Sequence, residues 1–343
     1  MSSSIFLETL SGKRNSKTPL WMMRQAGRYL PEYRKIRETQ SDFISFCLNP
    51  EKACEVTLQP ISRFGFDAAI IFSDILMVPW ALDRNVRFIP GTGPKLDRLM
   101  PEDALDFTKL DLIEDRLSPV GSALSMTRAK LDADKALIGF AGAPWTVITY
   151  IIEGGSSRDF VATRQWLWSH PKEFDRLLDY ITEATIKFLT VQARSGADAL
   201  MLFDSWASAV PASMRKKIVI APIGKIITAL RAEGIDLPII GFPKGIGEGI
   251  IEYAEENDVN ALAIDHMTDP IWVNDVVSKT MPIQGNLDPL SLISGGGEML
   301  QSIDNILEAF QDRPHIFNLG HGITPPTPIS NVEAMVARLR GSN

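Results

Sequence analysis

Residues 171–203, PKEFDRLLDYITEATIKFLTVQARSGADALMLF, place a long helical pattern directly before a short apolar strand. Across Pro171–Arg194, apolar side chains such as Phe174 and Phe188 recur at the spacing of one helix face. The run Ala199–Phe203 is short and apolar, as parallel strands buried on both faces are. A helix that leads into a buried strand is the repeating unit of α/β folds.

The same alternation extends over most of the chain, and a second clear helical pattern covers Met299–Phe310. The expected strands are Leu20–Met23, Ala68–Phe72, Ala136–Ala141, Ala199–Phe203, Pro238–Phe242, Ala261–Ile264, Pro282–Gln284 and His315–Leu319. Eight strands with intervening helices predict a single (β/α)8 TIM barrel over residues 1–343, with its site at the carboxyl ends of the strands. An open doubly wound sheet is the alternative, but no Gly-x-Gly-x-x-Gly follows the first strand. Residues 73–135 are expected to form an excursion on the barrel rather than a second domain.

Composition excludes several classes of protein. The 343 residues are 45% hydrophobic and 22% charged, as in an average globular chain, and the formal net charge of −7 disfavours binding to nucleic acid. Two cysteines, Cys47 and Cys54, form no Cys-x-x-Cys pair, so a disulfide framework is not indicated. No signal peptide is visible, and the longest uncharged apolar stretch, 136–152, is too short to span a membrane. We therefore expect a cytoplasmic protein.

A barrel would bring the residues that follow its strands together at one site. These residues are Arg24, Arg28, Asp74, the stretch 143–150, Asp204, Ser205, Lys244, Asp265, His266, Asn286 and His321.

The segment that follows the first expected strand contains four arginines between Arg24 and Arg37. Arginine binds carboxylates through two parallel hydrogen bonds, and Gly27 lets the backbone approach a ligand or turn sharply. The segment is either an anion-binding loop or a solvated helix face with surface ion pairs. Its position after a strand, in an acidic protein, favours the anion-binding loop.

Four other residues have a functional and a structural interpretation. Asp74 is a base, a cation stabiliser or a metal ligand, or else it caps the helix that follows. Tyr150 offers a hydroxyl to a ligand or packs in the core. Ser205 lies outside any Gly-x-Ser-x-Gly motif and is a hydrogen-bonding residue or a helix cap. His321, between two glycines at the end of the last strand, is favoured as a ligand contact.

Two stretches, Pro19–Arg34 and Gly139–Thr146, resemble the signature sequences of the uroporphyrinogen decarboxylase family. Shorter matches occur in the same order around Asp74, Ser205 and His321, and also at 285–289. Together they extend from about residue 18 to the C-terminal helix.

The resemblance implies a TIM-barrel homodimer that needs no metal or other cofactor. The implied reaction removes CO2 from the four acetate side chains of uroporphyrinogen III and gives coproporphyrinogen III in porphyrin and haem synthesis. Matching the motifs residue by residue implies substrate contacts at Arg24, Gln25, Ala26, Gly27, Arg28, Asp74, Tyr150, Ser205 and His321. Asp74 is the implied transition-state stabiliser, and Arg37 is a second catalytic candidate by its spacing from Arg24.

This chemistry agrees with the residues. Protonation of a pyrrole next to its nitrogen makes the ring an electron sink, and an ionised Asp74 would stabilise the resulting cation. Arg37 is a poor acid at neutral pH, so a substrate carboxyl group or an arginine-held water is an equal candidate for the proton donor. The two rival functions are a related zinc-dependent barrel methyltransferase and a non-enzymatic tetrapyrrole carrier.

Overall fold

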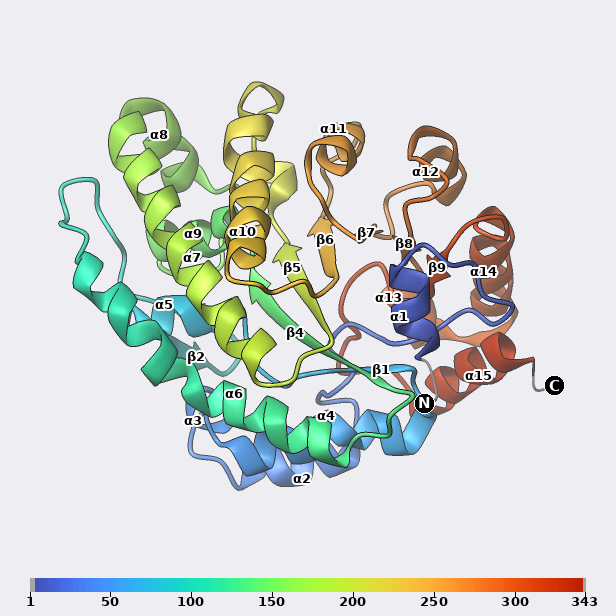
Figure 1. Cartoon of the computed structure of the whole chain (residues 1–343). Coiled ribbons are helices and arrows are strands. Elements are labelled where there is room, and N and C mark those ends of the chain that lie inside the picture. The colour runs from blue at the N-terminus through green and yellow to red at the C-terminus, as the bar shows by residue number, and fades with distance from the viewer. Residues whose placement is uncertain (1–3, 342–343) are drawn as a thin grey trace.

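The computed structural model describes residues 4–341 and contains parallel strands that alternate with helices (Figure 1). The strands are β1 (Ala68–Ile70), β2 (Arg87–Ile89), β3 (Gly93–Lys95), β4 (Ala136–Gly142), β5 (Ala199–Asp204), β6 (Ile239–Pro243), β7 (Ala261–Ala263), β8 (Ile283–Gln284) and β9 (His315–Ile316). The helices are α1 (Ile5–Leu10), α2 (Pro31–Glu38), α3 (Phe43–Cys47), α4 (Pro50–Phe64), α5 (Met77–Ala81), α6 (Ile113–Lys130), α7 (Pro144–Glu153), α8 (Val161–Ser169), α9 (Pro171–Arg194), α10 (Ala221–Ala232), α11 (Gly249–Glu256), α12 (Pro270–Val276), α13 (Pro289–Ser294), α14 (Gly296–Ala309) and α15 (Ile329–Arg340).

Seven of the strands form one curled parallel sheet in the order β1-β4-β5-β6-β7-β8-β9. Every residue of β4 and β6 is buried, which explains why these strands are apolar throughout instead of alternating. The seven strands confirm seven of the predicted runs, with ends shifted by up to three residues. Because all strands run the same way, their carboxyl ends lie along one edge of the sheet.

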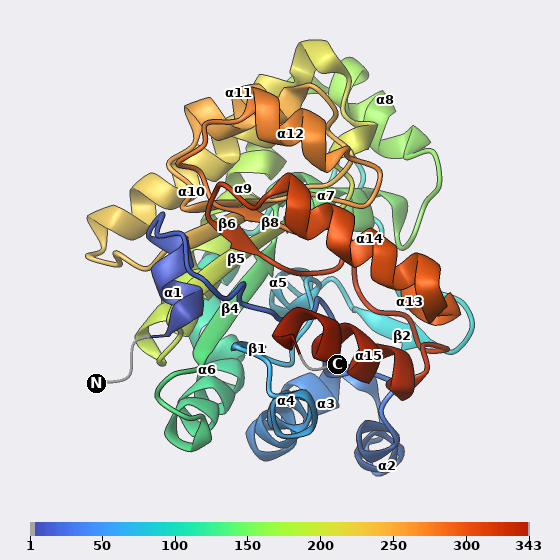
Figure 2. The same cartoon turned by 90° about the vertical axis from the view of Figure 1, so that its right-hand side faces the viewer.

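Helices cover the outside of this sheet in both views (Figures 1 and 2). The predicted helix Pro171–Arg194 is confirmed as α9, which packs against β4, α6 and α10. Its buried face includes Phe174 and Phe188, as the spacing of apolar residues predicted. The predicted helix Met299–Phe310 corresponds to α14, which begins three residues earlier.

The predicted strand Leu20–Met23 is wrong beyond its first residue. Leu20 forms an isolated parallel bridge with Phe317, which lies just after β9. The backbone N–H of Met23 then bonds to the side-chain oxygen of Asn318 (2.9 Å) instead of to a neighbouring strand. A strand ladder cannot continue where a side chain takes the donor, so the sheet has seven strands where eight were expected.

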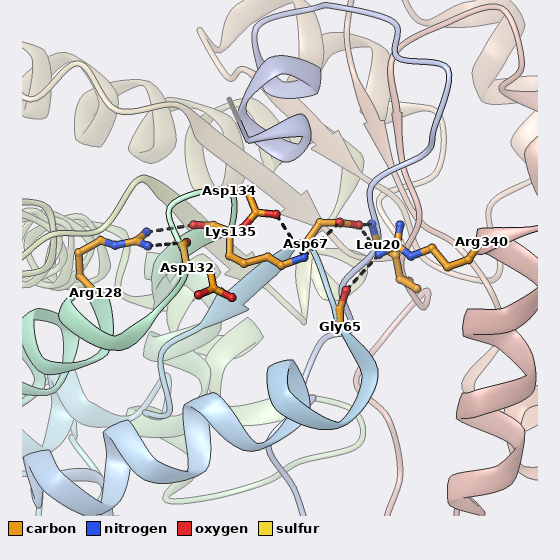
Figure 3. Close-up of polar contacts among 8 residues, drawn as sticks. All are labelled: Leu20, Gly65, Asp67, Arg128, Asp132, Asp134, Lys135 and Arg340. Atoms are coloured by element: carbon orange, nitrogen blue, oxygen red, sulfur yellow. Dashed lines mark hydrogen bonds and ion pairs between the residues drawn. The ribbon is translucent and has the colours of Figure 1, made fainter. Parts of the chain in front are cut away.

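Leu20 is nevertheless fixed beside β1 by a buried carboxylate (Figure 3). Oδ2 of Asp67 accepts the N–H of Leu20 (2.8 Å) and a guanidinium N–H of Arg340 (2.7 Å). The C=O of Leu20 accepts the N–H of Asp67 (2.9 Å), and Nζ of Lys135 lies 3.8 Å from Oδ1 of Asp67. This contact set, which we call the Asp67 seam, joins the N-terminal segment and the last helix to the start of β1.

Residues 73–135 form an excursion between neighbouring strands, as predicted, because β1 pairs directly with β4. The excursion contains α5, the antiparallel pair β2–β3 and α6. Gly91 lies in the turn between β2 and β3 with φ of 75°, a conformation that favours glycine.

Candidate active site

The arginine-rich segment forms a loop that enters α2, and a buried glutamine holds it in place. The side-chain oxygen of Gln25 accepts the N–H of Met22 (3.1 Å), and its amide donates to the C=O of Ala68 in β1 (3.1 Å). The hydroxyl of Tyr29 donates to the C=O of Gln25 (2.9 Å). The side chain of Gln25 is fully buried and bonded to backbone at both ends, so it positions this loop. Its predicted contact with substrate stays a prediction.

Within this loop, Arg24 has a left-handed backbone conformation, with φ of 61°, which is energetically unfavourable for a non-glycine residue. Its side chain lies against Gly322, where an added Cβ would be 2.3 Å from Cδ of Arg24. A Cβ on Gly27 would be 3.0 Å from the C=O of Arg24. Both glycines therefore provide room for the conformation of Arg24, and Ala26 is half-buried against the core.

Asp74 lies after β1, within the electrostatic reach of Arg24. Burial raises the pKa of Asp74 to about 6, while the N–H of Leu76 and the charge of Arg24 oppose this shift. The hydrogen bond from the N–H of Leu76 to Oδ1 of Asp74 is 2.8 Å long. Asp74 therefore orders the turn before α5, and its half-buried side chain also faces a guanidinium. The capping and electrostatic interpretations are both compatible with this geometry.

Arg28 and Arg37 lie on the same side of the site as Asp74. The hydroxyl of Tyr33 in α2 is influenced by the charges of all three, although burial is the largest cause of its raised pKa. Arg28 is exposed, whereas Arg37 is half-buried and donates to the C=O of Gln40 (3.0 Å). The structure thus brings both predicted arginines into the neighbourhood of the buried carboxylate.

Tyr150 and Ser205 approach the site from the next strands along the sheet. Tyr150 lies on α7, half-buried, with its ring centroid 6.5 Å from that of Trp206. Burial raises the pKa of Tyr150. The charge of Asp74 raises it further, whereas the charge of Arg24 lowers it. Ser205 is half-buried in the turn immediately after β5.

His321 lies after the last strand, near Arg24. Burial lowers the pKa of His321 to about 3, and the charges of Arg24, Lys244 and His266 lower it further. The imidazole is therefore neutral at pH 7 and offers one donor and one acceptor. A Cβ on Gly320 would lie 2.2 Å from the backbone nitrogen of His266, so the two loops touch there.

Two residues, Asp204 and Lys244, were expected at this site from their positions after strands but were given no chemical role. Lys244 follows β6, and its Nζ lies 5.8 Å from the centroid of the Trp206 ring. Asp204 ends β5, where burial raises its pKa to about 7 and its Oδ1 accepts the hydroxyl of Thr146 (2.5 Å). Lys244 could be found from its position after a strand, but the packing of its side chain on Trp206 could not.

No carboxylate of residues 4–341 forms an ion pair with Arg24, Arg28 or Lys244. Other cations, such as Lys172 and Arg176 of α9, also lack such a partner, so it is their place in the candidate site that distinguishes these three. Cations in such a place, with a half-buried aspartate nearby, suit a ligand that carries several carboxylates.

Residues 4–341 offer neither a metal-binding cluster nor a membrane-spanning helix. No group of three or more His, Cys, Asp or Glu side chains in this range could hold a metal ion. None of the helices described there is long and apolar enough to cross a membrane.

Comparison with known proteins gives a family and a fold. The family model described as "Uroporphyrinogen decarboxylase (URO-D)" matches residues 1–341. The chain is 49% identical to the uroporphyrinogen decarboxylase of Maricaulis maris, covering 97% of this chain and 96% of the relative. It is 47% identical to that of Sphingopyxis alaskensis, covering 98% and 97%.

Among solved structures, a methyltransferase from Methanosarcina mazei superposes with a TM-score of 0.80, at 18% identity and with 98% and 97% of the two chains covered. A B12-independent methionine synthase from Shewanella sp. W3-18-1 gives a TM-score of 0.56, at 10% identity, with 85% and 86% covered. These two similarities concern the fold.

Proposed function

The chain belongs to the uroporphyrinogen decarboxylase family, and we propose that it removes CO2 from the four acetate side chains of uroporphyrinogen III to give coproporphyrinogen III. The observation that carries this proposal is that Arg24 lies within electrostatic reach of both Asp74 and His321 and Lys244 within reach of His321, while no carboxylate of residues 4–341 forms an ion pair with Arg24, Arg28 or Lys244. A substrate with eight carboxylates needs such cations, and its pyrrole needs a fixed anion when it becomes cationic.

In the proposed reaction, a proton adds to the pyrrole carbon next to the nitrogen, and the ring becomes an iminium-like cation. The bond between the acetate methylene and its carboxylate then breaks, and its electron pair neutralises the cation and leaves an exocyclic methylene as CO2 departs. A second proton adds to this methylene to give the methyl group, and the ring carbon loses its added proton to restore the pyrrole. Ionised Asp74 accepts the pyrrole N–H groups and stabilises the cation through a charge that is in place beforehand. Tyr150, Ser205 and His321 orient the substrate, with Gln25, Ala26 and Gly27 shaping the loop that holds Arg24 and Arg28. Arg37 orders the carboxyl group or water that delivers the proton.

The remaining features form part of the same proposal. The segment around Leu20 completes a closed (β/α)8 barrel between β9 and β1, and residues 1–343 form a single domain. The enzyme is a cytoplasmic homodimer that uses no metal or organic cofactor, because the substrate supplies its own electron sink.

The test is the release of CO2 from uroporphyrinogen by the purified protein after dialysis against a strong chelator, with metal content measured. We expect full activity, and coproporphyrinogen as the product. Activity that is lost with the metal and restored by zinc would contradict the mechanism and favour a zinc-dependent enzyme such as a methyltransferase. Binding of the tetrapyrrole without turnover would favour a carrier.

Arg28→Lys is expected to lower kcat/KM by roughly tenfold or more, because lysine keeps the charge but cannot form two parallel hydrogen bonds to a carboxylate. Steady-state kinetics measures the change, with thermal unfolding as the control for folding. Arg14→Lys is the matched control, since Arg14 is an exposed arginine near Asp312 on the surface (3.7 Å). Equal kcat/KM in Arg28→Lys and the wild type would contradict the anion-binding role of Arg28 and favour the alternative, a solvated surface residue.

A further inference from the structure

We propose that Lys244, held over the face of Trp206, binds a substrate carboxylate that is not reacting, opposite the carboxylates held by the arginine loop. This inference rests on the proposed function and adds a binding residue to the same site. Lys244 follows β6, and the sequence motifs gave it no role.

The backbone of Lys244 is fixed on both sides. Its N–H donates to the C=O of Asp204 at the end of β5 (3.1 Å), and its C=O accepts the N–H of Ser208 (3.3 Å). The side chain is half-buried, with Nζ 5.8 Å from the centroid of the Trp206 ring. A cation at this distance is attracted to the ring, and the aliphatic part of the side chain can cover the indole while the ammonium stays accessible.

Trp206 is itself held rigidly by α7. The backbone N–H of Trp206 donates to the hydroxyl of Thr146 (3.1 Å), which in turn donates to Asp204 (2.5 Å). Its C=O accepts the indole N–H of Trp145 (2.8 Å). The indole also packs against Phe160, at 5.1 Å between centroids. The surface under Lys244 is therefore formed before any ligand arrives, which lowers the entropic cost of binding.

No carboxylate of residues 4–341 forms an ion pair with Lys244. The two oxygens of Asp265 accept the N–H groups of Gly245 (2.7 Å) and Met267 (2.8 Å), which holds this carboxylate against the backbone and not on the ammonium of Lys244. Lys244 acts electrostatically on His321, as does Arg24, so both cations border the same imidazole. Lys244 comes from the end of β6, whereas Arg24 comes from the loop before α2. Two cations that come from different elements to the same site fit two different carboxylates of one polycarboxylate.

The experiment compares Lys244→Met and Lys244→Arg with the matched control Lys225→Met, which removes a lysine of α10 that is paired with Asp179 of α9 (2.9 Å). Binding is measured by fluorescence titration with uroporphyrin, the oxidised form that carries the same eight carboxylates but does not react. Steady-state kinetics with uroporphyrinogen gives KM and kcat. Loss of one charged hydrogen bond predicts that Lys244→Met raises Kd and KM roughly tenfold to a hundredfold, with kcat changed by less than about threefold.

Lys244→Arg should recover most of the affinity, and Lys225→Met should match the wild type. Trp206→Leu should raise Kd by roughly twofold to tenfold, and little further when combined with Lys244→Met, because the two residues act as one unit. Thermal unfolding of each variant controls for folding. Unchanged Kd in a folded Lys244→Met, or a loss confined to kcat, would overturn this inference. A wild type that binds uroporphyrin through Lys244 but releases no CO2 would overturn the proposed function alone.

Discussion

Replacing Asp74 by Asn should lower kcat by about 100-fold to 1,000-fold, the usual effect of removing one preorganised electrostatic contact. Asn keeps the shape of the side chain and can still accept the N–H of Leu76, but it loses the charge. The cation that this charge stabilises exists only near the transition state, so the loss should appear in kcat much more than in KM. Steady-state kinetics with uroporphyrinogen measures both parameters.

The stability of Asp74→Asn should change in the opposite direction. Burial raises the pKa of Asp74 to about 6 in the folded protein, above its ordinary value of 3.8, so the folded state binds the proton more tightly than the unfolded state. The stability contributed by protonated Asp74 is complete below pH 4 and is lost as the pH rises through about 6. Above that pH, Asn should raise the free energy of unfolding by roughly 1–3 kcal/mol, and the advantage should disappear near pH 4. Urea unfolding of both proteins at several pH values checks this.

Asp74→Glu distinguishes the charge from its position. It keeps the carboxylate but moves it by one methylene, so partial activity is expected. If Asp74 only caps the turn before α5, Asn should replace it with little change in activity. An Asp74→Asn protein that is as active as the wild type would remove Asp74 from the mechanism.

The sequence predicted those strands whose backbone pairs with backbone. The runs at Ala136–Gly142 and Ala199–Asp204 are apolar because both faces of the sheet are covered, and hydrophobicity alone located them. The expected strand at Leu20–Met23 was equally apolar, but Asn318 takes its backbone donor. A contact between residues 23 and 318 leaves no signal in local periodicity.

The site shows the same division. Position after a strand was enough to place Asp74, Tyr150 and His321 around one edge of the sheet, because its seven strands are parallel, whereas Arg24 reaches this edge although the run before it forms no strand. Local sequence could not reveal that the side chain of Gln25 forms its hydrogen bonds with backbone groups, since one of them belongs to the distant residue Ala68. Which carboxylate pairs with a given cation, as Asp67 does with Arg340, likewise depends on packing between distant elements.

The second large effect is expected at the Asp67 seam. Asp67→Asn should lower the free energy of unfolding by about 3 kcal/mol, because it leaves the guanidinium of Arg340 buried without its counter-charge. The side chains of Asp67 and Arg340 are 7% and 15% exposed, and their N–O distance is 2.7 Å. The same carboxylate also fixes the N–H of Leu20, so the loss is transmitted to the segment that leads into the arginine loop. Urea unfolding measures the change.

The matched control is Asp304→Asn, which breaks the pair between Asp304 of α14 and Arg338 of α15, the helix that also carries Arg340. Arg338 donates two hydrogen bonds to Asp304 (2.7 and 2.6 Å), a better geometry than at the seam, but the two side chains are 47% and 32% exposed. Solvent already stabilises these charges, so their separation should cost less than about 1 kcal/mol. A larger loss in Asp67→Asn would show that burial, more than hydrogen-bond geometry, makes a charge pair essential here. Equal losses in the two variants would contradict the role of the seam in holding the N-terminal segment against β1.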